Sequence, residues 1–504
     1  MKNNIKPPGI AAVLIPRMGE ILFIAIFIAL IGLGPKLMNV DGDLGRHITL
    51  GDHIISSRSI PTEDVFSHTK LGDPLTPHEW LADVIFALTH RAAGLDGVVW
   101  ITALVIGAAF WLVYKQSLNL SSMTFLALAG TILAAAASSL HWLSRPHIFT
   151  ILFTVIWTTE LEKLRIGIRK TWVIFPAIML IWVNTHGAFI AGILIWACYF
   201  MGLILDQKFS WQGIKPYLGI GLSSLLVSLI NPDGFGIWKT GFGFLGNRYL
   251  VSHTAEYLPP DFHQVSTWPF LLLIVLSIVV LAISKKKMNA SHILLLSGWT
   301  AMALYSARNI PLYAVTVVPI LVAVSADYIR GNKLKSAADK FIALQSRLMD
   351  IEKSLKGGLW SGIVVVVAGL LLIRGFTLDF QSKGNQFLEE VFPVQAIDWV
   401  ENNQLAGEGF NYFPWGGYLL YRLWPEKLVF IDGQTDFYGE ELTRKYEKVI
   451  TLSPGWEDVL QKYQISWVLM PTPSELIQHL QNLDNWDTVY QDQFSTIMLL
   501  GSGE

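Results

Sequence analysis

Two aspartates separated by one glycine follow the first long apolar run of the sequence. Asp41 and Asp43 begin a polar stretch that continues with Arg46 and His47. A carboxylate at such a place can act as a general base for a hydroxyl, and a pair can hold a divalent cation through oxygen ligands. The alternative is a solvated turn around Gly42. Because a cation and an imidazole follow directly, we expect a functional role for the two aspartates, with or without a metal ion.

Further polar side chains stand between later apolar runs, and some of them suit phosphate chemistry. They are His78, Glu79, Arg145, His186 and Arg308. The planar fork of an arginine matches phosphate oxygens, although a surface arginine can also extend to the membrane interface or pair with an acid. Charged groups near lipid need a partner or water. We therefore expect Arg145, His186 and Arg308 to converge with the two aspartates on one cavity.

The composition of the chain indicates the setting in which these residues act. Of its 504 residues, 52% are hydrophobic and 15% are charged, whereas soluble domains carry about 25% charged residues. A formal net charge of −2 gives no reason to expect nucleic acid as a partner. The lone cysteine, Cys198, excludes a disulfide framework and a cysteine metal site within one chain. The composition is typical of a membrane protein, so membrane lipid is an expected partner.

Eleven apolar runs are predicted to cross the membrane as helices. The segment 79–93 is not among them, because two acids, a histidine and an arginine interrupt it, and it is predicted to lie in the interface as an amphipathic helix. Basic residues then collect in alternate loops, above all in 163–170, 285–287 and 327–358. The positive-inside rule makes these loops and the N-terminus cytoplasmic. The predicted spans are 19–38, 97–114, 123–140, 147–162, 172–183, 187–205, 216–230, 268–284, 291–306, 310–326 and 359–374.

This topology defines two predicted domains. Residues 1–378 form an α-helical transmembrane domain with a long first outer loop at 39–96, and residues 379–504 form a soluble extracytoplasmic domain. In the second domain strands alternate with helices, which is typical of a small α/β domain. Its turns at 415–418 and 432–436 either face the membrane cavity or are tight glycine turns in a packing core. We expect a multi-pass protein of the plasma (inner) membrane.

The layout resembles the GT-C class of membrane glycosyltransferases, which take a sugar from a polyprenyl phosphate or diphosphate donor on the outer face of the membrane. Asp41-Gly-Asp43 stands where that class places its catalytic acidic motif. The C-terminal segment is similar to that of oligosaccharyltransferase catalytic subunits, through Trp415-Gly-Gly-Tyr418 and the strand that ends in Asp432. The tryptophan-tryptophan-aspartate signature of those enzymes is absent, since Pro414-Trp415-Gly416 stands there. Transfer of a single sugar to a lipid, glycan or protein hydroxyl therefore fits better than transfer of an oligosaccharide to asparagine.

The resemblance implies roles for the candidate residues. Asp41 or Asp43 would take the acceptor proton, and Arg145, Arg308 or both would neutralise the leaving phosphate. The competing hypothesis is a non-catalytic transporter, flippase or assembly protein for lipid-linked glycans. Because the polar residues lie on one side and the spans carry almost no charge at their centres, surface chemistry fits better than alternating access. Substrate binding is expected of Arg46, His47, His78, Glu79, Arg145, His186, Arg308, Trp415, Tyr418 and Asp432.

Overall fold

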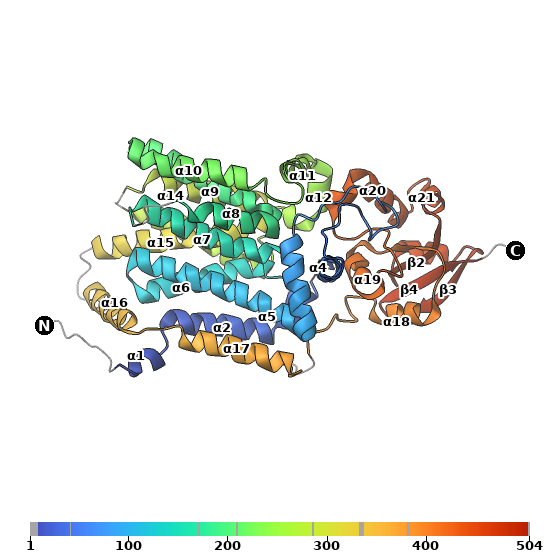
Figure 1. Ribbon diagram of the computed structural model, residues 1–504, viewed down its shortest axis with the longest axis horizontal. Helices are drawn as coiled ribbons and strands as arrows, with labels where there is room; N and C mark the ends of the chain where they lie inside the picture. The colour runs from blue at the N-terminus through green and yellow to red at the C-terminus, as the bar shows by residue number, and fades with distance from the viewer. Residues whose placement is uncertain are drawn as a thin grey trace.

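Long helices lying beside one another form most of the protein. The computed structural model describes residues 9–40, 42–168, 172–207, 210–284, 287–331, 337–380 and 384–501. A small sheet lies beyond one end of the helical bundle, while α1 (Ala11–Leu14) and α16 (Ala337–Ser354) lie near the other end (Figure 1). The bundle contains α2 (Met18–Gly32), α3 (Gly34–Met38), α5 (Trp80–Ser121), α6 (Thr124–Ser138), α7 (His147–Arg165), α8 (Ile174–Thr185), α9 (Ile190–Leu205), α10 (Trp211–Val227), α13 (Trp268–Ile283), α14 (Ala290–Tyr305), α15 (Ile310–Gly331) and α17 (Leu359–Ile373).

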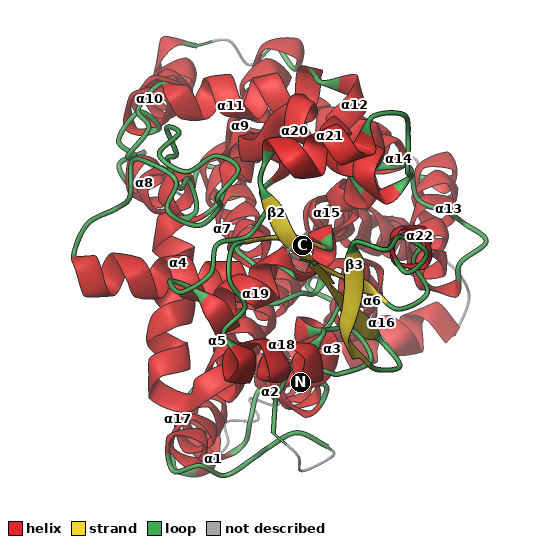
Figure 2. Ribbon diagram, turned by 90° about the vertical axis from the view of Figure 1, so that its right-hand side faces the viewer, coloured by secondary structure: helices red, strands yellow, loops and turns green. Residues whose placement is uncertain are grey.

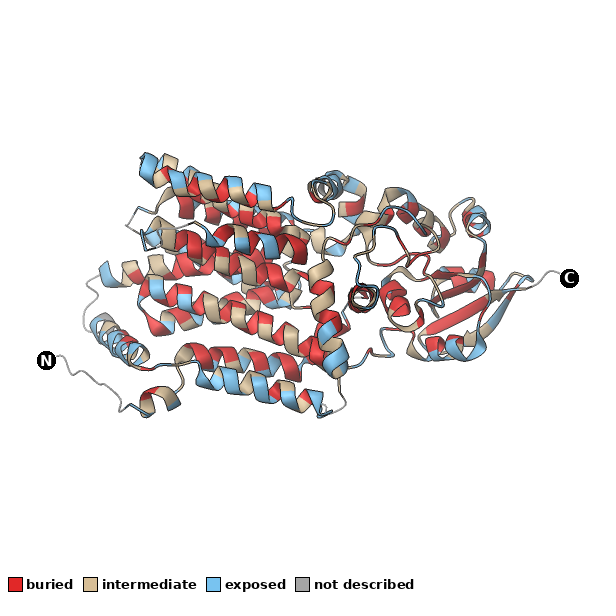
Figure 3. Cartoon of the chain, viewed as in Figure 1, coloured by how far each residue is buried: buried red, intermediate tan, exposed pale blue. Residues whose placement is uncertain are grey.

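The outer surface of the bundle is apolar, as its interior is. Outer helices such as α10 and α17 expose one face along much of their length (Figure 3). In α13 the exposed side chains include Leu272 at 48% and Ile278 at 62%. A helix that is apolar all round is stable only inside a protein core or in a bilayer. Because these side chains lie outside the core, the bundle is suited to lipid.

Six helical stretches within the described ranges are long and apolar enough to cross a membrane. The pair α16 and α17, bent by 62°, makes a seventh if it counts as one span. Each of the eleven segments predicted to cross overlaps a helix, but some helices, such as α8 with its 12 residues, are shorter than the ~20 residues that a full crossing needs. The chain is an integral membrane protein, and the count of eleven crossings stays a prediction.

Helix α5 bends where the segment 79–93 ends. Ala93 and Gly94 depart from helical dihedral angles, and Gly94 has a φ of +59°, which glycine adopts without the strain of a Cβ atom. The arm before the bend stands across the end of the bundle, and the arm after it runs along the bundle (Figure 1). The first arm thus has the orientation expected of an interfacial helix.

Short helices connect the long ones near the sheet end. The first outer loop contains α4 (Asp43–Ser57), which packs against α5 and against α19 (Gly416–Leu423). The other connections contain η1 (Ser139–His141), η2 (Gly187–Phe189), α11 (Gly236–Gly246), α12 (Arg248–His253), η3 (Ala255–Tyr257), η4 (Val265–Thr267) and η5 (Ala307–Asn309).

The C-terminal region contains a four-stranded sheet with helices around it, at the end of the bundle (Figure 2). The strand order is β1-β2-β4-β3; β1 is parallel to β2, and β4 is antiparallel to both β2 and β3. The elements are α18 (Val394–Asn403), β1 (Glu408–Asn411), η6 (Phe413–Trp415), α19, α20 (Thr435–Ile450), α21 (Trp456–Lys462), β2 (Ile465–Pro471), α22 (Glu475–Leu480), β3 (Trp486–Gln491) and β4 (Ser495–Leu500).

Successive side chains of β2 point into two different hydrophobic cores. Trp467 and Leu469 join the large core that continues into the bundle, whereas Val468 and Met470 join the core under α20, α21 and α22. This is the period of two that a strand imposes on its side chains. The sheet therefore separates the two cores and ties the C-terminal region to the end of the bundle.

The first outer loop is hydrogen-bonded to the C-terminal region. Ser67 and Val429 form a parallel bridge, in which the amide of Val429 donates to the carbonyl of Phe66 and the amide of His68 donates to the carbonyl of Val429, both at 3.1 Å. The hydroxyl of Thr69 donates to the carbonyl of Phe430 at 2.7 Å. Backbone bonds of this kind fix the register of the two segments, so the loop and the C-terminal region form one unit.

The predicted topology places α16 and the C-terminal sheet on opposite sides of the membrane, consistent with the positions of α16 and the sheet at opposite ends of the bundle (Figure 1). Helix α22 stands between strands β2 and β3 of that sheet in the sequence. In a Cys198→Ala background, Gln478→Cys should react with a membrane-impermeant maleimide on intact cells, and Lys353→Cys should react only after the membrane is opened. Both positions are exposed, so burial does not protect either one. Labelling of both on intact cells, or the reverse pattern, would contradict the topology.

Candidate functional site

The candidate residues come from short connections at the sheet end of the bundle. Each one stands at or next to a helix terminus, so the helix fixes where its side chain emerges. Asp43 is the first residue of α4, Glu79 directly precedes α5, Arg145 lies between η1 and α7, His186 lies between α8 and η2, and Arg308 belongs to η5.

Arg145 joins two carboxylates from different connections. Its Nη2 lies 2.7 Å from Oδ2 of Asp43, and its Nη1 donates to Oε1 of Glu256 at 2.5 Å. The side chains of Arg145, Asp43 and Glu256 are 21%, 19% and 26% exposed, so water screens these charge pairs only in part. One guanidinium therefore fixes Asp43 and Glu256 relative to each other.

Glu256 is shared between two arginines. Its Oε2 lies 3.8 Å from Nη1 of Arg308, which donates to the hydroxyl of Tyr257 at 2.5 Å. Burial by itself would raise the pKa of Glu256, but Arg145 and Arg308 outweigh that effect and hold the pKa at about 2. The Glu256 carboxylate is therefore ionised at neutral pH. Negative and positive groups alternate in the cluster formed by Asp43, Arg145, Glu256 and Arg308.

Hydrogen-bonding groups lie at both ring nitrogens of His186. The hydroxyl of Thr150 accepts from the indole of Trp182 at 2.8 Å and lies 2.9 Å from Nδ1 of His186. The amide of Ala188 also donates to this Nδ1, at 3.3 Å. Nε2 faces two groups of opposite character: Oε1 of Glu79 at 3.4 Å, and Nη2 of Arg308 at 3.3 Å, which can only donate.

The His186 ring is neutral. Burial lowers the pKa of His186 well below its ordinary value, and Arg308, whose Nη2 lies 3.3 Å from Nε2, lowers it further. On the other side of Glu79, Nε2 of His78 lies 3.9 Å from the same Oε1. A continuous chain of polar groups thus runs from Asp43 through the arginines to Glu79 and His78.

Arg46 and Asp432 form a second, more deeply buried pair. Nε of Arg46 lies 3.2 Å from Oδ2 of Asp432, their side chains are 9% and 1% exposed, and Nη2 of Arg46 donates to Gln434. The amide of Gln434 donates to Oδ1 of Asp432 at 2.8 Å. Burial raises the pKa of Asp432, and Arg46 acts against that rise. This pair joins α4 to the turn before α20.

Glycines bring this turn and Asp43 into direct contact. A Cβ atom on Gly433 would overlap Oδ1 of Asp43, and one on Gly42 would overlap the carbonyl oxygen of Pro414. A Cβ on Gly417 would likewise overlap the carbonyl oxygen of Gly42. The backbone of the C-terminal region therefore forms one wall around the Asp43 carboxylate, and only glycine leaves room for it.

His47 lies behind the cluster and orients α4. Its Nδ1 lies 2.7 Å from Oδ1 of Asp83, and both side chains are buried. Burial by itself would lower the pKa of His47, but the charge of Asp83 and the hydrogen bond raise it. The pair links α4 to the first arm of α5.

Two candidates are not brought to the cluster, and a third is not described. Trp415 and Tyr418 are buried in the hydrophobic core; the Trp415 indole donates to the carbonyl of Val391 at 2.7 Å, and the Tyr418 hydroxyl accepts from Arg422 at 2.8 Å. Both rings therefore make packing contacts. Of the two alternatives predicted for the 415–418 turn, a wall of the membrane cavity or a tight turn in a packing core, the second fits these contacts. Asp41 lies outside the described residues.

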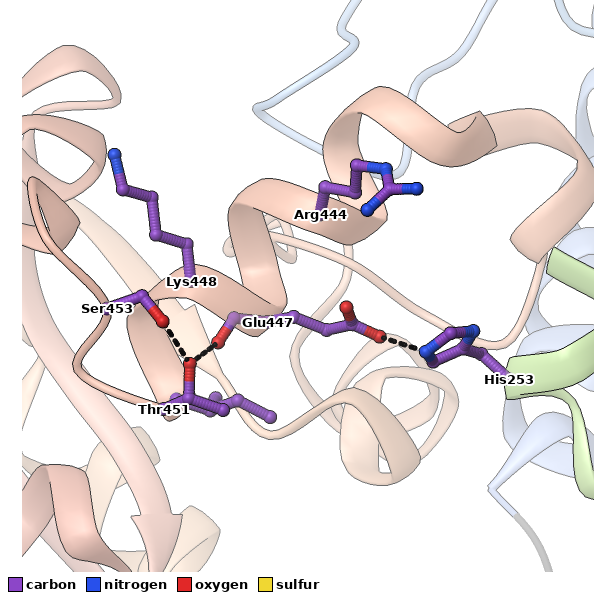
Figure 4. A pocket seen from close by; sticks show the side chains of 7 residues that line it. His253, Arg444, Glu447, Lys448, Thr451 and Ser453 are labelled. Carbon is purple, nitrogen blue, oxygen red and sulfur yellow. Dashed lines mark hydrogen bonds and ion pairs between the residues drawn. The ribbon is translucent and has the colours of Figure 1, made fainter. Parts of the chain in front are cut away.

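Two cavities lie near the cluster. An apolar one of about 450 Å³ is lined by Trp80, Leu81, Leu180, Ile181, Asn184, Ile230, Asn231 and Pro232. Two of its lining residues are near cluster neighbours in the sequence: Trp80 directly follows Glu79, and Asn184 precedes His186 by two residues. A polar cavity of about 500 Å³ lies between α12 and α20, where Figure 4 shows Glu447 facing His253 at 3.6 Å. His253 precedes Glu256 by three residues, so this cavity is close to the cluster but is not lined by its arginines.

Within the described ranges, no three His, Cys, Asp or Glu side chains are grouped so as to hold a metal ion. A bound divalent cation stays a prediction, since Asp41 is not among those residues.

The sequence-based selection missed Glu256 as a central residue. The signal for it was indirect: two lone arginines at a membrane surface require a carboxylate between them.

The buried pair Arg46–Asp432 should matter for stability far more than an exposed pair of the same type. Asp432→Asn leaves a buried guanidinium without its counter-charge and should cost about 3 kcal/mol or more of stability. Asp398→Asn breaks the pair of Asp398 with Arg422, in which Asp398 is 55% exposed, and should change stability by about 1 kcal/mol at most. Thermal unfolding of both variants in detergent measures the difference. Equal shifts would contradict the assigned role of the buried pair.

Comparison with known proteins identifies the fold. No family model and no curated protein matches the sequence. Among solved structures, ArnT from Cupriavidus metallidurans, bound to undecaprenyl phosphate, has a TM-score of 0.51 at 14% identity, over 95% of this chain and 97% of that one. The Archaeoglobus fulgidus oligosaccharyltransferase in its apo form has a TM-score of 0.53 at 12% identity, over 90% of this chain and 69% of that one. The resemblance to the GT-C class is thus confirmed at the level of the fold, and the chain has the fold of these membrane transferases.

Proposed function

We propose that the chain is a membrane glycosyltransferase, which moves a sugar from a polyprenyl-phosphate-linked donor to a hydroxyl of a lipid, glycan or protein on the outer face of the membrane. The observation that carries this proposal is the cluster of Asp43, Arg145, Glu256 and Arg308 at one end of an apolar bundle. Carboxylates and guanidinium groups at the membrane surface are what such a reaction needs. The shared fold supports the same class of activity.

The reaction would be a displacement at the anomeric carbon of the sugar. The acceptor oxygen forms a bond to that carbon, the bond between that carbon and the phosphate oxygen breaks, and the electron pair leaves with the polyprenyl phosphate. The acceptor proton passes to Asp43 or Asp41 as general base. Arg145 and Arg308 stabilise the charge that develops on the leaving phosphate. His186 is neutral, because burial and the neighbouring Arg308 lower its pKa, and it therefore adds no charge to the site.

The apolar cavity beside Trp80 is suited to the first isoprene units of the donor. Leu180, Ile181 and Ile230 line it, together with Trp80, which directly follows Glu79 in the chain. A polyprenyl chain in this cavity would enter from the lipid, with its phosphate toward the arginines. The remainder of the chain would lie in the bilayer along α8 and α10.

The proposal includes the predicted orientation. The transmembrane domain 1–378 has its N-terminus in the cytoplasm, and 379–504 is an extracytoplasmic α/β domain that closes the site from outside. The contact of Gly433 with Asp43 supports this closure. The polar cluster lies at one end of the bundle, which supports chemistry at one membrane face rather than transport through the bundle.

Asp43→Asn should reduce sugar transfer from a polyprenyl-linked donor at least about 100-fold, because asparagine keeps the shape of aspartate but cannot accept the proton. Asp41→Asn is tested in the same way and decides which aspartate is the base. The matched control is Asp52→Asn on the same helix, since Asp52 pairs with Arg91 at the surface and should transfer normally. The measurement is donor consumption by membranes that contain equal amounts of each folded variant. Normal turnover by the double aspartate variant would contradict the assignment.

Arg308→Ala should weaken donor binding as well as slow transfer, because part of the phosphate charge is present before the reaction begins. We expect the Kd for undecaprenyl phosphate to rise about tenfold or more. Arg91→Ala, which removes a surface arginine from the same end of the protein, is the control and should leave the Kd unchanged. A normal Kd in Arg308→Ala would place the phosphate elsewhere.

A further inference from the structure

Glu256 occupies the position between the two arginines of the cluster. Its Oε1 accepts from Arg145 at 2.5 Å and its Oε2 lies 3.8 Å from Arg308, so one oxygen faces each guanidinium. An anion with two oxygens directed at two arginine forks has the geometry in which arginines also bind phosphate. The carboxylate thus stands where a donor phosphate would have to bind.

The backbone that carries Glu256 is fastened to the segment that carries Arg308. The hydroxyl of Ser306 donates to the carbonyl of Glu256 at 3.1 Å, and the amide of Ala307 donates to the carbonyl of Leu258 at 2.9 Å. The backbone of the two segments would therefore move together. Rotation of the Glu256 side chain can therefore separate its carboxylate from Arg308 without moving either backbone segment.

The charges of the carboxylate and of a donor phosphate match. A sugar phosphodiester carries one negative charge, as ionised Glu256 does, so an exchange of the two leaves the net charge of the cluster unchanged. Because the pKa of Glu256 is about 2, the side chain cannot leave by taking up a proton at neutral pH. It leaves the arginines as an anion, and a donor phosphate is an anion that can take its place there.

A nearby histidine offers a partner for the displaced side chain. Nε2 of His141 is buried and has no hydrogen-bond partner within the described part of the chain. Glu256 is close enough to His141 to interact with it electrostatically. Burial lowers the pKa of His141, so its ring is neutral, and it can offer a carboxylate that rotates away from the arginines a hydrogen bond rather than a counter-charge.

We propose that Glu256 is an internal counter-ion, which holds Arg145 and Arg308 in place in the empty site and which the donor phosphate displaces. This inference rests on the proposed function, because it requires a phosphate ligand at the arginines. Glu256 is a positioning residue rather than a catalytic one. On product release it returns to the arginines and competes with the polyprenyl phosphate for them.

If Glu256 competes with the phosphate, removal of its charge should strengthen phosphate binding. If Glu256 only supports the arginines, the same change should weaken phosphate binding. With Glu256→Gln in the full-length protein in detergent, the Kd for undecaprenyl phosphate should fall about tenfold, since the ligand no longer competes with a carboxylate. The matched control is Glu447→Gln, because Glu447 is also a half-buried carboxylate near α12 but pairs with His253 and Tyr249 instead of the arginines. This control should bind as the parent does.

Weaker binding by folded Glu256→Gln, in the direction of Arg308→Ala, would overturn the inference, because it would mean that Glu256 only supports the arginines. If Glu256→Gln does not fold, Glu256→Asp keeps the charge but withdraws it by one methylene, and should still bind more tightly than the parent. Weaker or equal binding by that variant would also overturn the inference. If the parent itself binds no undecaprenyl phosphate, the proposed function fails and the inference fails with it.

Discussion

Arg145 forms ion pairs with Asp43 and with Glu256, so one guanidinium joins the first outer loop to the connection before α13. A charge that is partly buried at the end of an apolar bundle costs several kcal/mol without a partner. Asp43, Arg145, Glu256 and Arg308 come from four different connections, and each of them pairs with a charge from another connection. The positions of the loops are therefore coupled through their charges, and the cations are arranged before any ligand arrives, which is the condition for electrostatic stabilisation of a transition state.

The C-terminal region completes this arrangement through backbone contact rather than through charge alone. Gly42 and Gly417 allow the start of α4 to touch the turn before α19, and Gly433 lies against the Asp43 carboxylate. The buried pair of Arg46 and Asp432 then fixes the distance between the two segments. Because these contacts leave no space, a shift of the C-terminal region would move Asp43. The membrane-embedded and C-terminal parts thus behave as one site-forming unit.

Much of the helical arrangement could be predicted from the sequence because hydropathy and helix length are local properties. The charges of the segment 79–93 distinguish it in the sequence from the apolar span that follows, and the bend at Ala93 and Gly94 lies where the segment ends. Arg145, His186 and Arg308 were identified as lone polar groups between apolar runs, where a charged side chain needs a partner.

Other features depend on contacts between distant segments and could not be predicted. Glu256 is one acid among several in a long outer connection, and only the fold shows that it lies between two arginines. The turn from Trp415 to Tyr418 has a pattern that suits either a cavity wall or a core, and packing against the bundle decided for the core. The role of Gly433 follows from a contact with a residue nearly 400 positions away in the chain, for which the sequence holds no local signal.

The central claim is that the arginines of this cluster receive a polyprenyl phosphate. An experimental structure of the protein with undecaprenyl phosphate tests it most directly. The account predicts phosphate oxygens within hydrogen-bond distance of Arg145 and Arg308, the Glu256 carboxylate rotated away, and the lipid chain beside Trp80. A phosphate bound elsewhere, for example in the polar cavity between His253 and Arg444, with Glu256 still between the two arginines, would contradict it.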